Sequence, residues 1–133
     1  MSGSSGVTTT PARVLVVDDD PLTRRFVGGL LRQKGHEVHE AVDGEDALRA
    51  VHALQPRLVI LDIVMPMKDG YEVLETLKAD PATKRIPVLI LSMRSREEDV
   101  VKGLKLGAED YVTKPFNAQE LMVRIGKILE RTW

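Results

Sequence analysis

The chain lacks cysteine and any long apolar run, and these absences exclude several kinds of protein. With no Cys among its 133 residues, it cannot form disulfides, use a thiol nucleophile or bind zinc through thiolates. No apolar segment approaches the roughly 20 residues that span a bilayer, and residues 1–12 lack the apolar core of a signal peptide. We therefore expect a cytoplasmic protein without a membrane partner.

A strong net charge is also missing. Lys plus Arg number 19 and Asp plus Glu number 20, which gives a net charge of -1. Dedicated nucleic-acid binders carry a clear excess of basic residues. We therefore expect no direct contact between this chain and nucleic acid.

Length and composition fit one globular domain with a short leader. A chain of 133 residues, 43% of them apolar, is long enough to bury a single core. The first ten residues read MSGSSGVTTT, a composition with almost nothing to bury. We predict that residues 1–12 are a flexible leader, in part of artificial origin, and that residues 13–131 form the domain.

Predicted strands and helices alternate five times along the chain. Continuous apolar runs such as Val14–Val17 are typical of strands covered on both faces, whereas the mixed run Glu37–Val42 is typical of an edge strand. This alternation with short connections predicts an α/β three-layer sandwich with a parallel sheet and right-handed crossovers. The helices are predicted to begin near residues 21, 44, 71, 96 and 117. The strands are predicted at Arg13–Val17, Glu37–Val42, Arg57–Asp62, Ile86–Leu91 and Tyr111–Val112.

Apolar periodicity predicts which helix faces are buried. The first helix ends before Gly35, a residue that favours helix termination. One face of this helix carries Leu22, Phe26 and Leu30. The last helix opens at Asn117 with Glu120 three residues later, an arrangement similar to a capping box. Its buried side is predicted to contain Leu121, Ile125, Ile128 and Leu129.

The histidines give no sign of a functional role. All three lie at the ends or outer positions of predicted elements, as His36, His39 and His52. We interpret them as surface residues that neither bind metal nor carry phosphate.

Polar residues follow the apolar runs at four predicted strand ends. The first strand is followed by Asp18–Asp20, and the third ends in Asp62. The fourth strand is followed by Ser92 and the fifth by Lys114. Ligands of parallel sheets bind at the carboxyl ends of the strands, so we expect these side chains to converge on one edge.

This set of side chains favours metal-assisted phosphoryl transfer. Carboxylates packed together repel one another unless a cation lies among them, and oxygen ligands of this kind suit Mg²⁺. Asp62 would be the nucleophile that forms an aspartyl phosphate, while Lys114 and Ser92 stabilise the phosphoryl oxygens. Taken singly, Asp20 before Pro21 also fits a helix N-cap, and an Asp at a strand end often forms a turn.

The motifs at these strand ends resemble those of the response-regulator receiver family of two-component signalling. The resemblance spans about residues 13–131 and implies a flavodoxin-like, CheY-like fold whose five strands have the order 2-1-3-4-5. It also implies that Asp62 takes its phosphoryl group from a phosphohistidine on a sensor histidine kinase or phosphotransfer protein. The matching segments are Val16–Pro21, Leu61–Pro66, Asp69–Gly70, Leu91–Ser92 and Tyr111–Phe116.

The resemblance also assigns a role to each site residue. It implies that Asp19 and Asp62 bind Mg²⁺ directly, while Asp18 acts mainly through water. The backbone carbonyl of Val64 matches the family's remaining protein ligand. The residues that contact the phosphoryl group, or that switch conformation when it arrives, are Ser92, Lys114 and Tyr111.

Two positions beside the implied site depart from the family's usual pattern. Met93 stands where members usually carry Ala or Gly, so it either swings clear as a flexible side chain or partly covers Asp62 and slows the entry of small donors. Val64 is apolar where some members are polar, which predicts slower hydrolysis because Val cannot orient the attacking water. The resemblance further implies a cis peptide bond before Pro115.

Charges of both signs occupy the last two predicted helices and the last predicted strand, between Lys102 and Arg131. They form either a solvated face or the interface of a homodimer similar to that of receivers of the OmpR/PhoB transcription-factor type. Phosphorylation would shift a two-state equilibrium at this face and so control an effector or partner. We expect a signalling switch that modifies itself, not a turnover enzyme.

Two other functions are open as alternatives. A metal-dependent phosphohydrolase with an Asp nucleophile would need a second acidic group two residues beyond Asp62, where the chain has Val64. An interaction module that works without phosphorylation would not need the site residues, all of which are present.

Overall fold

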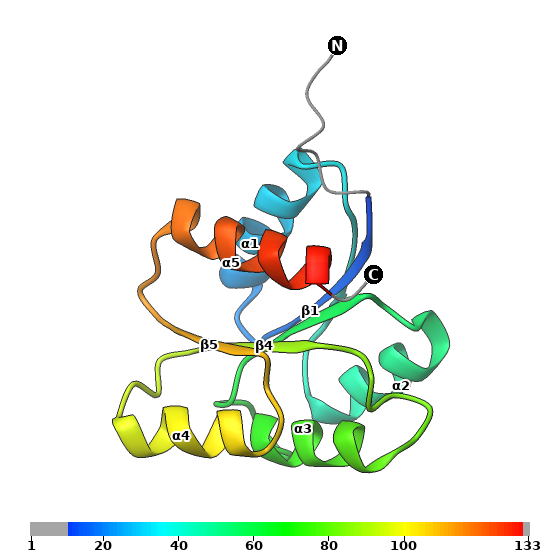
Figure 1. Cartoon of the computed structure of the whole chain (residues 1–133), viewed down its shortest axis with the longest axis vertical. Helices are drawn as coiled ribbons and strands as arrows, with labels where there is room; N and C mark the ends of the chain where they lie inside the picture. The colour runs from blue at the N-terminus through cyan, green and yellow to red at the C-terminus, as the bar shows by residue number, and fades with distance from the viewer. Residues whose placement is uncertain (1–10, 132–133) are drawn as a thin grey trace.

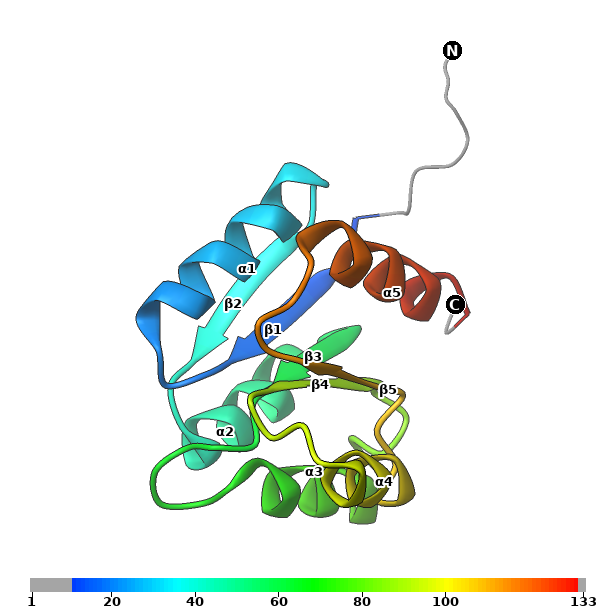
Figure 2. The same cartoon turned by 90° about the vertical axis from the view of Figure 1, so that its left-hand side faces the viewer.

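A five-stranded parallel sheet lies between two layers of helices in the computed structural model, which describes residues 11–131 (Figures 1 and 2). The strand order is β2-β1-β3-β4-β5, so the predicted fold class and strand order are confirmed. The strands are β1 (Arg13–Val17), β2 (Glu37–Ala41), β3 (Leu58–Leu61), β4 (Val88–Ser92) and β5 (Asp110–Thr113). The helices are α1 (Pro21–Gln33), α2 (Gly44–Leu54), α3 (Gly70–Ala79), α4 (Glu97–Lys105) and α5 (Ala118–Arg131).

The sheet separates two apolar cores. Helices α2, α3 and α4 cover one face, while α1 and α5 cover the other (Figure 2). Every residue of β3 and β4 is buried, because successive side chains of a central strand point into opposite cores. In β2, by contrast, only Ala41 is fully buried, as predicted for an edge strand. The carboxyl ends of β1, β3 and β4 meet at one edge of the sheet.

The buried face of α1 differs from the predicted one. Leu22 is 69% exposed and Phe26 is 54% exposed. The residues that α1 buries against the sheet are Val27, Gly28 and Leu31. Because Gly28 carries no side chain, the face of α1 that packs against the sheet shows only a weak apolar pattern in the sequence. The stronger apolar spacing of Leu22 and Phe26 belongs to a neighbouring face of the helix. Phe26 instead packs beside Phe116, with their ring centroids 5.8 Å apart.

The surface prediction for His36 is wrong, because this side chain is buried. Gly35 turns the chain in the left-handed region at φ 88, which brings His36 under the start of β1. The His36 Nδ1 atom accepts a hydrogen bond of 3.1 Å from the amide of Ala12. His39 and His52 lie nearer the surface, each beside a carboxylate. Of the predicted leader, residues 1–10 lie outside the described residues, while Ala12 is buried.

The predicted helix starts are largely confirmed by their caps. Asp20 is the N-cap of α1, and its carboxylate accepts a hydrogen bond from the Leu22 amide. Before α5, the Asn117 side chain accepts from the Glu120 amide, while the Glu120 carboxylate pairs with Arg124.

Within residues 11–131, no helix is long and apolar enough to cross a membrane.

Candidate functional site

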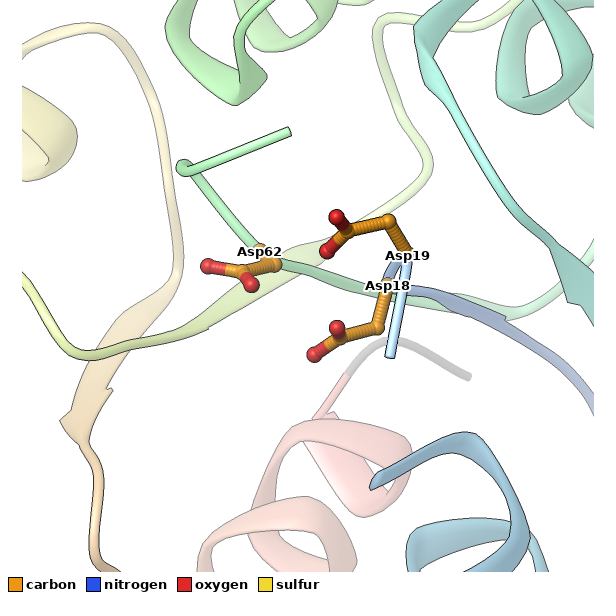
Figure 3. Close-up of side chains that lie close together, drawn as sticks. All are labelled: Asp18, Asp19 and Asp62. Atoms are coloured by element: carbon orange, nitrogen blue, oxygen red, sulfur yellow. The ribbon is translucent and has the colours of Figure 1, made fainter. Parts of the chain in front are cut away.

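Three carboxylates from two neighbouring strands meet at the carboxyl edge of the sheet. Asp18 and Asp19 follow β1, and Asp62 follows β3 (Figure 3). Since Val17 lies opposite Leu61 in the parallel ladder, the next residue of each strand reaches the edge at the same height. Each of the three offers an oxygen, and these oxygens all lie within 4.8 Å of one another. The structure thus brings the predicted acidic residues together.

Lys114 links two of these carboxylates. Its Nζ lies 2.8 Å from Asp18 Oδ2 and 3.3 Å from Asp62 Oδ2. Both carboxylates are buried, whereas Asp19 is exposed. The Lys114 amide donates to the carbonyl of Ser92 at 2.9 Å, which fixes the lysine where β5 runs beside β4.

The charges of the site shift the protonation of its members. Burial raises the pKa of the Asp62 carboxyl, and the nearby charge of Asp18 raises it further, against the opposing effect of Lys114. Burial lowers the pKa of Lys114, but its hydrogen bond with Asp18 and the charge of Asp62 outweigh burial and leave that pKa raised. One ammonium therefore does not compensate the buried negative charge around Asp62.

The donor set of the acidic cluster fits a hard divalent cation. Mg²⁺ prefers carboxylate oxygens and retains several waters, and a partly exposed cluster with Asp19 at its open side allows both. A cation here would also offset the repulsion between Asp18 and Asp62. Val64 donates its amide to Asp62 Oδ1 at 3.2 Å, while the predicted role of its carbonyl as a ligand stays a prediction.

Ser92 and Tyr111 both form hydrogen bonds with the backbone of Arg94. Ser92 ends β4 with no exposed surface, and its Oγ accepts a hydrogen bond from the Arg94 amide at 3.2 Å. The Tyr111 ring is turned inward at 8% exposure, and its hydroxyl donates to the Arg94 carbonyl at 2.7 Å. The Lys114–Pro115 peptide bond is cis, as predicted.

The two departures from the family pattern are exposed side chains. Met93 is 73% exposed and Val64 is 51% exposed. An exposed Met93 favours the interpretation in which its thioether swings clear into solvent.

The loop between β3 and α3 contains two features that were not predicted from the sequence. A Cβ atom on Gly70 would collide with the backbone carbonyl oxygen of Asp62, so only glycine lets α3 start this close to the phosphoacceptor candidate. Asp69 and Glu72 form a complete capping box at the start of α3. The capping box could have been predicted from the spacing of Asp69 and Glu72 in the sequence. The close approach of Gly70 to Asp62 becomes visible only in the folded structure.

Comparison with known proteins agrees with this geometry. The family model described as "Response regulator receiver domain" matches residues 14–126. The chain therefore belongs to the response regulator receiver domain family of two-component systems.

Two relatives of about twice this length are regulators of transcription. Over 120 residues the chain is 39% identical to the DNA-binding dual master transcriptional regulator RpaA of Synechocystis, covering 90% of this chain and 50% of that protein. Over 119 residues it is 40% identical to the phosphate regulon transcriptional regulatory protein PhoB of Escherichia coli, covering 90% and 52%. The chain thus spans about half the length of the curated relatives it matches.

Solved structures share the whole fold. The receiver domain of the Francisella response regulator 1452 has a TM-score of 0.86 and 34% identity, covering 92% of this chain and 99% of that one. The chemotaxis protein CheY4 of Vibrio cholerae has a TM-score of 0.83 and 30% identity, covering 90% and 99%.

Proposed function

We propose that this domain is a phosphorylation switch in which Asp62 accepts a phosphoryl group from a phosphohistidine of a sensor histidine kinase or phosphotransfer protein. The observation that carries the proposal is the contact of Lys114 with both Asp18 and Asp62 at the edge of the sheet. This contact places a cation beside a carboxylate nucleophile where charge develops during transfer.

Each residue has a defined part in the proposed transfer. An Asp62 oxygen attacks the phosphorus while the bond from phosphorus to the imidazole nitrogen breaks, and the electron pair stays on the imidazole. Lys114 moves from Asp62 to a phosphoryl oxygen, and the Ser92 hydroxyl donates to another. Asp19, Asp62 and the Val64 carbonyl, with Asp18 mainly through water, would hold Mg²⁺, which would supply charge neutralisation at the phosphoryl oxygens.

The proposed output is a change at the face formed by α4, β5 and α5. Ser92 and Tyr111 both contact the segment around Arg94 that leads into α4, so a shift of the Ser92 hydroxyl toward a phosphoryl group reaches α4 directly. Since RpaA and PhoB are transcriptional regulators, we infer that this face controls a DNA-binding effector, with homodimerisation as the means. The domain catalyses only its own modification and turns over no separate substrate.

The phosphohydrolase alternative has less support. Such an enzyme needs a second acidic group two residues beyond the nucleophile, and Val64 at that position is an exposed apolar side chain. No observation on the described residues favours this function.

Mass spectrometry of the intact protein tests the proposal. With Mg²⁺ and acetyl phosphate, wild type should gain one phosphoryl adduct, which is absent without Mg²⁺ and absent in Asp62→Asn. Failure of wild type to gain the adduct, together with no response to beryllofluoride by NMR, would favour the interaction module that works without phosphorylation.

A further inference from the structure

The α4 helix is attached to the domain through little buried surface. Within Glu97–Lys105, all of which the structure describes, Gly103 is the one buried residue, whereas α3 buries five. At the N-cap position of α4, the Arg96 side chain makes no capping hydrogen bond in the described structure. Specific contacts from neighbouring elements therefore decide where α4 lies.

Tyr71 of α3 makes two of these contacts. Helices α3 and α4 lie side by side on the same face of the sheet (Figures 1 and 2). The Tyr71 side chain is buried between them, and its hydroxyl donates a hydrogen bond of 3.0 Å to the Asp99 carbonyl in the first turn of α4. One turn further, Lys102 Nζ lies 4.4 Å from the centroid of the Tyr71 ring, a cation–π contact. Tyr71 thus contacts α4 through a hydrogen bond and through the cation–π contact of its ring.

The same residue is fixed to the site by the chain. Tyr71 follows Gly70, whose amide donates to the Ile63 carbonyl at 2.9 Å and where an added Cβ would collide with the backbone of Asp62. The capping box of Asp69 and Glu72 fixes the start of α3 in addition. A displacement at Asp62 therefore moves the base of the Tyr71 side chain.

Tyr111 holds α4 from the other side. Its hydroxyl donates to the Arg94 carbonyl just before α4, and its ring lies so close to Gly103 that a Cβ atom there would be 3.0 Å from the ring. Burial raises the pKa of Tyr111, and the interaction with Tyr71 raises it further. Two tyrosines from different elements together bind carbonyls of Arg94 and Asp99.

We propose that Tyr71 is a positioning residue that links the Asp62 site to α4 and holds α4 where Tyr111 is turned inward. Rearrangement of α4 then requires the contact between Tyr71 and Asp99 to break. The part of the proposal that concerns phosphorylation rests on the proposed function, while the attachment of α4 does not.

Hydrogen–deuterium exchange of the unmodified protein tests the attachment first. Tyr71→Phe keeps the ring beneath Lys102 and removes only the hydroxyl. We expect exchange in residues 97–105 to rise about fivefold, the factor that corresponds to one lost hydrogen bond, with exchange in β1 and α5 unchanged. Lys102→Met, which removes the cation from the ring, should raise exchange in the same segment by a smaller factor.

Thr76→Val is the matched control. Thr76 also lies on α3 and donates its hydroxyl to a backbone carbonyl, that of Glu72 at 2.9 Å, but this bond does not reach α4. It should leave exchange in residues 97–105 as in wild type. Unchanged exchange there in Tyr71→Phe, or an equal rise over the whole domain, would overturn the proposal.

A second arm separates this proposal from the proposed function. With Mg²⁺ and acetyl phosphate, Tyr71→Phe should gain the Asp62 adduct to the same extent as wild type, while the change in α4 exchange caused by phosphorylation becomes several-fold smaller. A purely structural role of Tyr71 would leave that change intact and so contradict the link to Asp62. If wild type gains no adduct, the proposed function fails, and the first arm still decides the attachment of α4.

Discussion

At the scale of single residues, Met93 tests how access to Asp62 is controlled. The sequence left two interpretations open, and the exposed side chain favours the one in which Met93 swings clear of the site. We therefore expect Met93→Ala to change the rate of Asp62 labelling by acetyl phosphate by less than about twofold, because an exposed thioether leaves the barrier almost unchanged. Quenched time courses analysed by intact mass measure this rate. A clearly faster variant would show that Met93 covers Asp62.

His36 makes stability depend on pH. Burial lowers the pKa of His36 from its ordinary value of 6.5, and the charge of Arg57 lowers it further. Since the unfolded state then binds the proton more readily, the stabilisation by neutral His36 is complete above about pH 6.5 and is lost as pH falls through the lowered folded-state pKa. Urea unfolding should show a smaller loss of stability from about pH 7 to pH 5 in His36→Gln than in wild type.

The matched variant for this measurement is His52→Gln. His52 is an exposed residue beside Asp80, at 3.4 Å, so its replacement controls for the removal of a surface histidine while the contacts of His36 stay in place. Parallel profiles for wild type and His36→Gln would contradict the assignment of this dependence to His36.

The site residues were easier to predict than the residues that support them. Asp18, Asp62 and Lys114 follow apolar runs, and parallel strands bring their carboxyl ends together whatever the details of packing. The burial of His36 depends instead on the left-handed turn at Gly35 and on the position of Ala12 in space. Contacts of this kind join residues far apart in sequence and leave no local pattern.

At the scale of secondary-structure elements, Gly70 sets the junction between β3 and α3. An added Cβ would meet the backbone of Asp62 and lie 2.7 Å from the Cα of Ile63, and backbone atoms cannot swing away as a flexible side chain can. We expect Gly70→Ala to lower the free energy of unfolding by about 1–3 kcal/mol and to slow labelling of Asp62, because the end of β3 must shift. Chemical unfolding and the acetyl phosphate assay measure the two effects.

Gly29→Ala supplies the comparison. Gly29 lies in α1 with nothing within 4 Å of an added Cβ. The substitution should raise stability by about 0.5–1 kcal/mol through helix propensity and leave labelling unchanged. Equal effects of the two substitutions would show that Gly70 has no special contact.

Helix positions were predicted well, but helix faces were predicted unevenly. For α5, all four residues predicted to be buried are buried, because its apolar side chains form one continuous stripe. For α1, Gly28 interrupts the inner face, and the exposed pair Leu22 and Phe26 gives the stronger periodicity. A periodic pattern identifies the buried face only when that face is the more apolar one.

At the scale of the whole molecule, the alternation of strands and helices in the sequence was enough to predict the three layers and the parallel sheet. The order of the strands came from the family resemblance, since the apolar runs of β3 and β4 are equally compatible with several central positions. The sheet confirms the order and places both edges, with β2 at one side and β5 at the other. Under the proposed function, edge strand β5 with its flanking helices is the surface that would meet a second copy.

Substitution of Arg124 tests whether charged side chains on this surface hold a homodimer together. In the monomer, Arg124 pairs with Asp110 at 2.8 Å and with Glu120 at 2.9 Å, and all three are solvent-accessible. Exposed pairs of this kind contribute only about 0–1 kcal/mol each, so Arg124→Glu should leave the fold intact. It would however place three acidic groups together on a face that, in a symmetric dimer, meets its own copy.

We therefore expect Arg124→Glu to weaken dimerisation of the beryllofluoride-treated domain by about tenfold or more, a change of about 1.4 kcal/mol. Sedimentation equilibrium with and without beryllofluoride measures the dimer constant. Arg49→Glu is the control, because Arg49 is a highly exposed arginine on α2, away from this face, and pairs only loosely with Asp46 at 3.7 Å. If Arg124→Glu dimerises as tightly as wild type and Arg49→Glu, these charges form a solvated face, and any dimer is held by other contacts.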